Sequence, residues 1–499
     1  LEEEICRYST MATGAKKIVI IGGGIIGCSV AWRLAREGNA VTVLERGRLG
    51  REASWAAAGM IAPQAEAQAA GPFFDLCVRA REVFEPTLEM LRADTEVDPE
   101  YDRKGILYLA LNDSERAELV ERAQWQSAAG GAVEELSPEA ARKLEPAISP
   151  ETVYALHMPL DRRVENRKLT QAYAAAAAAR GAQFVEGVTV LEAVTRSGRV
   201  TAVRSHDGRL FESDVVVNAA GSWAGAIRGI DDRVETHPVR GQMVCFEARP
   251  ETLGVSIFSL RGYLVPRRDG RILAGSTMEE AGFDKSVTLA GLAKIARGAI
   301  EMVPALGDLP FREAWAGLRP ATRDFLPVLG ASPSAPNFFY ATGHFRSGIL
   351  LSAITGEILA DLIQGRKPAL EIAPFSPSRF AASAQIKALG LVRDILFRSR
   401  IDAAAQTLGV EVAYASEWER ARGRCAELKP KLVFVDLSDA NFTLDKIYGE
   451  IRSATAGTRL IGFASHVDLK ALKSARDAGF DMTLSRSEFT ARIAELLSS

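Results

Sequence analysis

The segment from Lys16 to Arg46 constrains the fold of this chain more than any other stretch. A short apolar run leads into the sequence GGGIIG at residues 22–27, which is followed by a helical pattern and by a second apolar run that ends in Glu45. A G-x-G-x-x-G turn between a strand and a helix is typical of a dinucleotide-binding fold, in which the pyrophosphate lies at the N-terminus of the helix. We therefore predict that this segment forms a nucleotide-binding strand, helix and strand.

The three glycines of the motif have separate physical roles. Gly22 allows the tight turn, Gly24 lets a pyrophosphate approach the backbone, and Gly27 lets the helix pack closely against the sheet. Glu45 lies about 20 residues after the turn, where a carboxylate accepts hydrogen bonds from the hydroxyls of an adenosine ribose. A carboxylate at this point argues against a 2′-phosphate, but the motif does not choose between NAD and FAD.

Length and composition limit the class of protein. With 499 residues the chain has room for about three domains. A net charge of -2 and a hydrophobic content of 47% predict a soluble globular protein, without an electrostatic basis for binding nucleic acid or an anionic membrane. No run reaches ~18 uninterrupted apolar residues, so we expect no membrane span.

The N-terminus and the cysteines favour a cytoplasmic location. Residues 1–15 are acidic and then polar, which is the wrong order for a secretory signal, and we interpret them as an N-terminal tail with Met11 as the candidate start. The cysteines lack a C-x-x-C pair and any spacing typical of metal ligands. We interpret them as reduced thiols and expect no metal site. They are Cys6, Cys28, Cys77, Cys245 and Cys425.

Small residues gather in two later segments that are candidates for ligand contact. Residues 46–63 are dense in alanine and glycine, so their backbone can lie flat against a large planar ligand. The turn NAAGSWAG at 218–225 follows a strand expected at 214–218, and ligands of open α/β sheets bind at the carboxyl ends of strands. Between the two segments, apolar spacing predicts an amphipathic helix over 73–91.

The pattern changes after His237. From there to about Leu318, short alternating runs predict a largely antiparallel sheet inserted into the nucleotide domain. The segment from Asn337 to Ile363 then predicts a strand, a glycine-containing turn and a helix. We therefore expect the chain to return to the first sheet near its end.

A series of motifs occurs in order between residues 16 and 375: GGGIIG with the later pair Glu45-Arg46, SWAAAGMIAP, NAAGSWAG, GYLVPR, GSTM, WAGLRPATRDFLPVLG and ATGHFRSGILL. Together they resemble the D-amino-acid oxidase superfamily of flavoproteins and, within it, the glycine oxidases associated with thiamine biosynthesis. The resemblance implies FAD that is held without a covalent bond. Covalent attachment, as in some sarcosine oxidases, needs a suitably placed cysteine, and none lies near His344 in the sequence.

The motif and the resemblance together assign a set of residues to the cofactor. They are Gly22, Gly24, Ile25, Ile26, Gly27, Glu45, Arg46, Ser54, Ala58, Gly59, Met60, Val190, Gly221, His344, Phe345, Arg346, Ser347, Gly348, Ile349 and Leu350.

For the substrate, the resemblance points to Tyr263, Arg319 and Arg346, with Met278 lining the pocket. The bidentate fork of an arginine holds an amino acid carboxylate best, which favours Arg319 as the anchor. Tyr263 can donate its hydroxyl to the same carboxylate. Two roles stay open for Arg346, one toward the flavin and one toward the surroundings of the amino group. We interpret His344 as a structural donor and not as a catalytic base.

The implied reaction is hydride transfer from the substrate Cα to flavin N5, with the amine neutral and without a required protein base. The imino acid leaves, and molecular oxygen is reduced to hydrogen peroxide. We therefore predict oxidation of glycine or another small amino acid, in thiamine thiazole biosynthesis. The alternatives are a D-amino-acid or sarcosine-type oxidase or dehydrogenase, and a flavin-binding regulatory protein. The oligomeric state stays open, a homo-oligomer included.

After the turn-rich APFSPSRF, an alternating pattern of strand and helix begins with an expected strand, GLVRDILF at 390–397. It predicts a doubly wound α/β domain that resembles a response-regulator receiver, with Asp436 at the phosphoacceptor position and Ser465 at the hydroxyl position. A working receiver needs an acidic pair for Mg²⁺ after its first strand, where this chain has DILFRSR at 394–400. It also needs a lysine after its fifth strand, where this chain has Ser485 or Arg486. We interpret the domain as a degenerate receiver that serves docking or dimerisation, with an unknown protein partner.

The predicted fold class is α/β, or α+β overall. It combines a tail at 1–15, an FAD-dependent oxidoreductase at 16–380 and a receiver-like domain at 386–499. The FAD-binding domain takes about 16–85, 150–235 and 319–375, and the inserted, mainly antiparallel substrate domain takes about 86–149 and 236–318.

Overall fold

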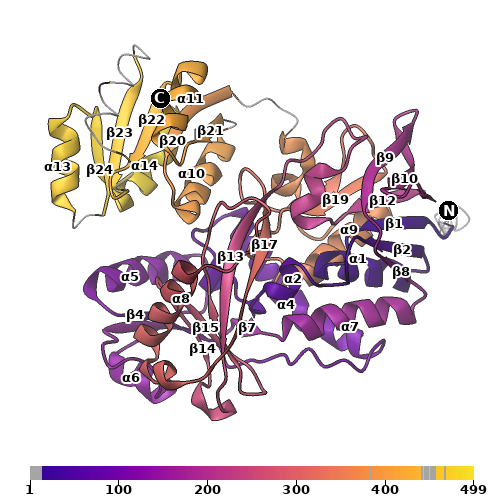
Figure 1. Cartoon of the computed structure of the whole chain (residues 1–499), viewed down its shortest axis with the longest axis horizontal. Coiled ribbons are helices and arrows are strands. Elements are labelled where there is room, and N and C mark those ends of the chain that lie inside the picture. The colour runs from indigo at the N-terminus through magenta and orange to yellow at the C-terminus, as the bar shows by residue number, and fades with distance from the viewer. Residues whose placement is uncertain are drawn as a thin grey trace, which may run out of the picture. The chain divides into compact units, whose positions relative to one another are not determined.

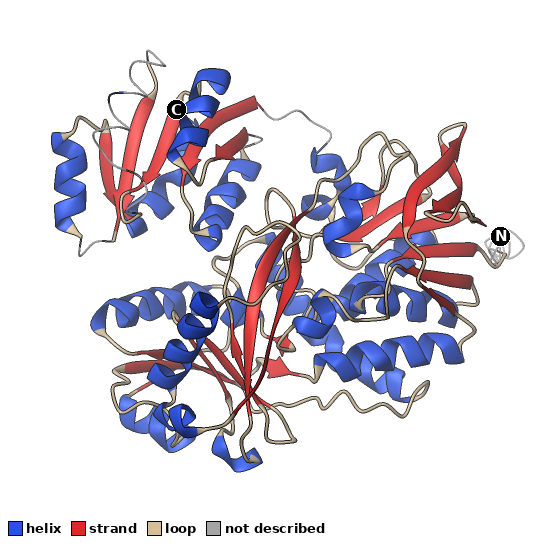
Figure 2. Cartoon of the chain, viewed as in Figure 1, coloured by secondary structure: helices blue, strands red, loops and turns tan. Residues whose placement is uncertain are grey.

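The computed structural model of the protein describes residues 14–380, 385–408, 410–439, 442, 449, 457–465 and 468–498. Its elements are labelled in Figure 1 and coloured by type in Figure 2. The chain divides into two compact units, the first formed by Leu1–Thr322 with Leu326–Ala381 and the second by Arg323–Phe325 with Ala382–Ser499. The finer domain boundaries stay a prediction.

The first unit contains a six-stranded sheet in which the glycine motif follows the strand β1. Its strand order is β18 (Val328–Ala331), β19 (Phe338–Thr342), β12 (Val215–Asn218), β1 (Lys17–Ile21), β2 (Ala40–Glu45) and β8 (Gln183–Glu186). Neighbouring strands pair in parallel except β18, which is antiparallel to β19. Ile21 pairs with Asn218, and Asn218 pairs with Tyr340. The carboxyl ends of β1, β12 and β19 therefore lie at one edge of the sheet.

Different layers cover the two faces of this sheet. The helices α1 (Ile25–Arg36), α4 (Pro72–Arg92), α7 (Asn166–Ala179) and α9 (Ser352–Ile363) pack on one face. The three-stranded sheet β9 (Val190–Arg196), β10 (Arg199–Ser205) and β11 (Leu210–Glu212) packs on the other. Ile18 and Ile20 belong to the first core and Val19 and Ile21 to the second, because successive side chains of a strand point to opposite faces.

A mixed eight-stranded sheet forms most of the rest of this unit. Its order is β17 (Phe311–Ala321), β13 (His237–Phe246), β16 (Ile272–Gly275), β15 (Gly262–Pro266), β14 (Ser256–Ser259), β4 (Ile106–Ala110), β6 (Tyr154–Met158) and β5 (Glu134–Leu136). The pairs are antiparallel except β14 with β4, which agrees with the expected inserted sheet. The sequence predicts that residues from about 150 onward, and so β6, belong to the FAD-binding domain. However, β6 pairs with β4 and β5 and therefore belongs to the eight-stranded sheet.

Helices cover both faces of the eight-stranded sheet. Side chains of α6 (Pro138–Leu144) and α8 (Leu289–Met302) pack on one face. Side chains of α5 (Asp113–Ala128) and of the small-residue segment from Ala56 to Met60 pack on the other. This second face thus meets the segment that was expected to lie flat against a planar ligand.

The second unit has a five-stranded parallel sheet. Its order is β21 (Val410–Tyr414), β20 (Gln385–Leu391), β22 (Leu432–Asp436), β23 (Arg459–Ala464) and β24 (Met482–Ser485). Side chains of α10 (Ile395–Thr407) and α14 (Arg486–Ser498) form a core on one face, and those of α11 (Trp418–Leu428) and α13 (Leu469–Asp477) form a core on the other. The unit is therefore doubly wound.

The start of the second unit differs from the sequence expectation. The pattern of 390–397 favours a strand, but β20 ends at Leu391 and α10 begins at Ile395. Asp394 stabilises the start of this helix, since its Oδ1 accepts a hydrogen bond from the backbone N–H of Phe397 (3.1 Å). The prediction fails because a short apolar run fits a buried helix as well as a buried strand.

The structure describes only some of the residues on which the expectations for the N-terminus and the cysteines rest. The tail up to residue 13, with Cys6 and Met11, lies outside the described residues. Cys28, Cys77 and Cys245 are buried free thiols in the first unit. Within the described ranges, no helix is both long enough and apolar enough to cross a membrane.

Helix α1 comes very close to the preceding turn. A Cβ atom at Gly27 would lie 1.9 Å from the carbonyl oxygen of Gly22, which is far inside van der Waals contact. The turn cannot easily move away, because the backbone N–H of Gly22 donates to the carbonyl oxygen of Leu44 (2.8 Å). Gly27 therefore has the packing role that the motif predicts.

We predict that Gly27→Ala lowers the free energy of unfolding by about 1–3 kcal/mol, which is typical of an extra methyl group in a packed core. Thermal unfolding followed by circular dichroism measures this change. Gly423→Ala in α11 is the matched control, because its added Cβ would have no neighbour within 4 Å and alanine favours a helix. An unchanged melting temperature for Gly27→Ala would contradict the close approach.

Candidate active site

A large cavity of the first unit lies where the parallel strands of the six-stranded sheet end. It is lined by the last residues of β1, β2 and β19, by the turn after β12, and by residues of β13, β15 and β17. The empty space of the cavity, counted together with open solvent at its mouth, is about 1760 Å³. Its lining extends from the glycine turn to Tyr263 and Arg319, so a nucleotide-binding turn and polar side chains share one cavity.

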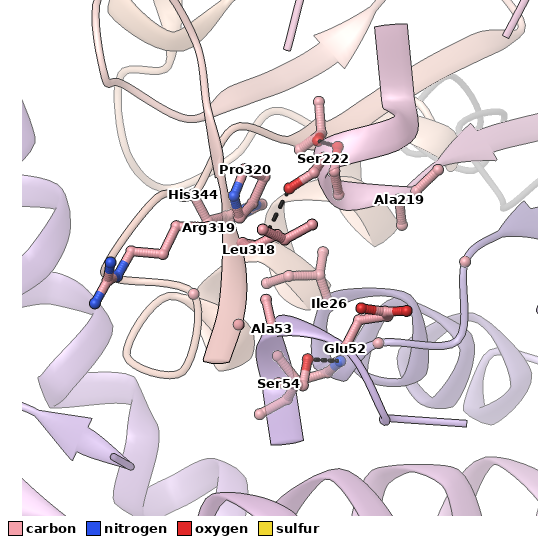
Figure 3. Close-up of a pocket in the computed structure, with 18 of the residues that line it drawn as sticks. Ile26, Glu52, Ala53, Ser54, Ala219, Ser222, Leu318, Arg319, Pro320 and His344 are labelled. Atoms are coloured by element: carbon pink, nitrogen blue, oxygen red, sulfur yellow. Dashed lines mark hydrogen bonds between the residues drawn. The ribbon is translucent and has the colours of Figure 1, made fainter. Parts of the chain in front are cut away.

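The glycine turn and Glu45 form one end of the cavity. The first turn of α1 carries no acidic side chain of its own, and the positive end of the helix dipole lies in the lining of the cavity. Ser54 Oγ accepts the hydrogen bond of the Ile25 N–H (2.9 Å) (Figure 3). The Glu45 carboxylate accepts from the backbone N–H groups of Gly23 and Gly47 (2.8 Å each). These groups fit the pyrophosphate and the adenosine ribose of a cofactor such as FAD.

Arg46 contributes to the rim at this end. Its guanidinium carbon lies 3.4 Å from the ring centroid of Trp223, a distance at which a cation is attracted to the ring face. Its Nη2 also donates to Glu52 Oε1 (2.7 Å). Arg46 is therefore stacked and ion-paired without a ligand.

Arg319 supplies a partly buried cation at another part of the cavity. In Figure 3 its guanidinium points away from Ile26 and Ser54, which mark the nucleotide end. A Cβ atom at Gly241, on the neighbouring strand β13, would lie 2.3 Å from Nη1 of Arg319. A side chain at position 241 would therefore displace the guanidinium from its present place.

The hydrogen-bond partners of Arg319 are neutral. Nη1 donates to the carbonyl oxygen of Thr277 (3.1 Å) and Nη2 donates to Ser276 Oγ (2.6 Å), and no carboxylate among the described residues forms an ion pair with it. Burial lowers the pKa of Arg319, and the neighbouring Tyr263 partly offsets this effect. A shielded guanidinium with neutral partners can accept a carboxylate in a bidentate pair.

Arg346, by contrast, is paired with Glu66, the last residue of the short helix α3 (Pro63–Glu66). Nε of Arg346 donates to Oε2 of Glu66 (2.7 Å). Burial lowers the pKa of Arg346, but the Glu66 carboxylate outweighs burial and the net shift is upward. Met278 Sδ lies 3.8 Å from Nη1 of Arg346. The charge of Arg346 is thus already compensated within the protein.

His344 lines the same wall as a neutral group. Burial lowers its pKa to about 3, and its Nε2 lies 3.0 Å from Thr355 Oγ1. Such a pKa makes histidine a weak base at neutral pH, which agrees with the structural interpretation. The next residue, Phe345, has a φ of 47°, a conformation that is unusual for a bulky residue and often occurs at functional sites.

The cavity brings most of the sequence-predicted residues together. The predicted residues that line it are Gly22, Gly24, Ile25, Ile26, Glu45, Arg46, Ser54, Ala58, Gly59, Met60, Val190, Gly221, Tyr263, Arg319, His344, Phe345, Arg346, Gly348 and Ile349. Contrary to the expectation, Met278 is not a lining residue and touches Arg346 instead. Gly27, Ser347 and Leu350 also lie outside the lining and are buried. The roles of these residues stay predictions.

Some lining residues have no counterpart in the sequence analysis. Glu66, Gly241, Met243 and Trp223 line the cavity. Trp223 lies within a motif that was singled out, and Glu66 is a lone acid in a run of small residues, which is a usable signal. Gly241 and Met243 reach the cavity through the pairing of β13 with β17, which local spacing does not reveal.

Comparison with known proteins agrees with this site. The family model described as FAD dependent oxidoreductase matches residues 17–362. The glycine oxidase of Geobacillus kaustophilus is 34% identical over 367 residues, which are 72% of this chain and 96% of that protein. The bifunctional protein ThiO/ThiG of Synechocystis sp. is 38% identical over 370 residues, which are 73% of this chain and 54% of that protein.

A solved structure shows that the similarity to glycine oxidase extends to the fold. The crystal structure of glycine oxidase from Geobacillus kaustophilus has a TM-score of 0.69 and 32% identity, covering 72% of this chain and 98% of that one. The family match spans all the residues that line the cavity. The chain therefore belongs to the family of FAD-dependent oxidoreductases.

Proposed function

We propose that this protein is an FAD-dependent amino acid oxidase of the glycine oxidase type. It oxidises glycine or another small amino acid to the imino acid, which water converts to the 2-oxo acid, while oxygen is reduced to hydrogen peroxide. The similarity to a glycine oxidase over nearly its whole length supports this activity. A role in thiamine thiazole synthesis is part of the proposal, supported by the similarity to the bifunctional protein ThiO/ThiG.

The observation that carries the proposal is that Arg319 donates its hydrogen bonds to neutral groups. Among the described residues, the arginines that line the cavity are Arg46, Arg319 and Arg346. Arg46 pairs with Glu52, Arg346 pairs with Glu66, and Arg319 contacts neutral groups. A small amino acid with a neutral amine carries one negative charge, so a single uncompensated arginine complements it.

The residues of the chain bind and orient the substrate in this proposal. Arg319 holds the carboxylate with both arms of its guanidinium. The Tyr263 hydroxyl lies 3.3 Å from Sδ of Met243, a weak acceptor, so a carboxylate oxygen is a better partner for it. Bound FAD supplies the hydride acceptor and the route of the electrons to oxygen. Holding the Cα in reach of the acceptor then accounts for much of the rate.

Two alternatives stay open. The first is a D-amino-acid or sarcosine-type oxidase or dehydrogenase, which uses the same carboxylate anchor with a different substrate or electron acceptor. The second is a flavin-binding regulatory protein without turnover. A cytoplasmic location and a homo-oligomer also stay predictions from the sequence.

We propose further that the second unit is a receiver-like docking or dimerisation module that is not phosphorylated. The strand order of its sheet, which is also that of flavodoxin-like folds, supports the resemblance. The buried carboxylate of Asp436 at the end of β22 accepts a hydrogen bond from Nη2 of Arg486 (2.8 Å). Arg486 directly follows β24, where a working receiver needs a lysine. Ser465 directly follows β23 and occupies the expected hydroxyl position.

We predict that Arg319→Leu lowers kcat/KM for glycine by about 100-fold or more, because removing one partner of a buried charge pair costs roughly 2–5 kcal/mol. Peroxide release by the FAD-loaded protein measures turnover, and the flavin absorption spectrum checks that the cofactor is still bound. Arg268→Leu is the control, since Arg268 pairs with Asp98 on the exposed surface and its loss is expected to leave turnover unchanged. Full activity of Arg319→Leu would refute the anchor.

We predict that His344→Gln leaves the shape of the pH profile of kcat/KM unchanged between about pH 5 and 9. A pKa of about 3 keeps the imidazole neutral throughout this range, so it contributes no inflection there. Initial rates with glycine across the range measure the profile. An inflection that is present in the natural protein and absent from His344→Gln would mean that His344 acts as a base.

We predict that a small phosphodonor with Mg²⁺ does not label Asp436. Arg486 already forms a hydrogen bond with the Asp436 carboxylate. Without an acidic pair beside Asp436, Mg²⁺ is held poorly and the charge of a phosphoryl group is not neutralised. Intact mass measurement before and after incubation gives the answer. An added phosphoryl group that is lost in Asp436→Asn would show that the module is an active receiver.

A further inference from the structure

Glu66 and Arg346 face each other in the wall of the cavity, on the substrate side that Arg319 and Tyr263 also line. The side chain of Arg346 is 20% exposed and that of Glu66 is 12% exposed. Both charges are therefore largely shielded from solvent. Charges interact more strongly in such surroundings than in water, so a charged ligand group beside this pair feels each of its members.

A network behind the cavity wall fixes the position of Glu66. The Asp161 carboxylate accepts hydrogen bonds from the backbone N–H groups of Gln64 (3.2 Å) and Ala65 (3.0 Å), at the start of the same short helix. Arg122 donates to the carbonyl oxygen of Gln64 (3.0 Å). Asp161 and Arg122 thus hold the backbone of the short helix that ends in Glu66.

The pair limits the number of carboxylates that the substrate end attracts. Glu66 compensates Arg346, whereas Arg319 has only neutral hydrogen-bond partners in the described part of the chain. Burial lowers the pKa of both arginines and Glu66 raises both, but the net shift is upward for Arg346, which is hydrogen-bonded to Glu66, and downward for Arg319. The substrate end therefore offers one uncompensated positive charge.

We propose that Glu66 is a specificity-determining residue that restricts the substrates to amino acids with a single carboxylate. The inference rests on the proposed amino acid oxidase function and extends it to the substrate class. A second carboxylate near Arg346 would meet the carboxylate of Glu66, and the two like charges repel each other in a shielded site. Once residue 66 is neutral, Arg346 becomes a second anchor and diacids become ligands.

The test compares acetate with malonate as ligands of the FAD-loaded protein. Binding is measured by the change that each anion causes in the flavin absorption spectrum, so turnover is not needed. In Glu66→Gln we expect the Kd of malonate to fall by about tenfold or more and the Kd of acetate to change by less than about threefold. The rate of flavin reduction by D-aspartate relative to glycine is expected to rise in the same variant.

Glu279→Gln is the matched control. Glu279 accepts from Nε of Arg240 (2.6 Å) in a partly buried ion pair of the same unit, and neither residue lines the cavity. The substitution removes the same charge by the same chemistry. It is expected to leave both dissociation constants unchanged.

Arg346→Leu tests the inference in the opposite direction. It leaves the Glu66 carboxylate uncompensated, so both anions are expected to bind more weakly and malonate more so than acetate. This variant also decides the matter if Glu66→Gln fails to hold FAD, because unchanged anion binding in Arg346→Leu would overturn the inference.

The outcomes separate this inference from the proposed function. Acetate binding in the natural protein without a gain of malonate binding in Glu66→Gln would overturn the role of Glu66 and leave the anchor at Arg319 intact. If the natural protein bound neither anion and no amino acid reduced its flavin, the proposed function would fail and the role of Glu66 with it.

Discussion

Parallel backbone pairing of three distant segments is the interaction on which the site depends. Strand β12 lies between β1 and β19, and Asn218 at its end pairs with both Ile21 and Tyr340. This pairing brings the glycine turn after β1, the small-residue turn after β12 and the His344 turn after β19 to one edge of the sheet. The cavity exists because these three turns meet there and the eight-stranded sheet closes the other side.

The electrostatics of the cavity follow from how its charges are paired. The dinucleotide end combines a helix N-terminus with the fixed carboxylate of Glu45, which suits a pyrophosphate and a ribose. At the substrate end, Arg346 is compensated by Glu66, and the partly buried Arg319 donates to neutral acceptors. His344 adds no charge at neutral pH because burial lowers its pKa to about 3. This pairing supports our proposal of a small monoanionic substrate, and a reaction without a protein base stays a prediction.

The spacing of residues in the sequence predicts those parts of the site that are formed by residues close together in the chain. The roles of Gly22 and Gly27 follow from the turn itself, and the return of the chain to the first sheet follows from a second strand, turn and helix. Glu66 could not be assigned in this way, because its partner Arg346 lies 280 residues further along the chain. The strand prediction for 390–397 was wrong for another reason. The few apolar residues of this segment fit a strand as well as a helix, and part of the segment belongs to the helix α10.

The most direct test of the account is the absorption spectrum of the FAD-loaded protein during anaerobic addition of glycine, with sarcosine and D-alanine in parallel. The account predicts that glycine bleaches the oxidised flavin band, that air restores it, and that hydrogen peroxide appears in equal amount. A preference for sarcosine or D-alanine would favour the alternative of a sarcosine-type or D-amino-acid oxidase or dehydrogenase. Bound flavin that stays oxidised with all three amino acids would contradict the central claim that this cavity oxidises a small amino acid.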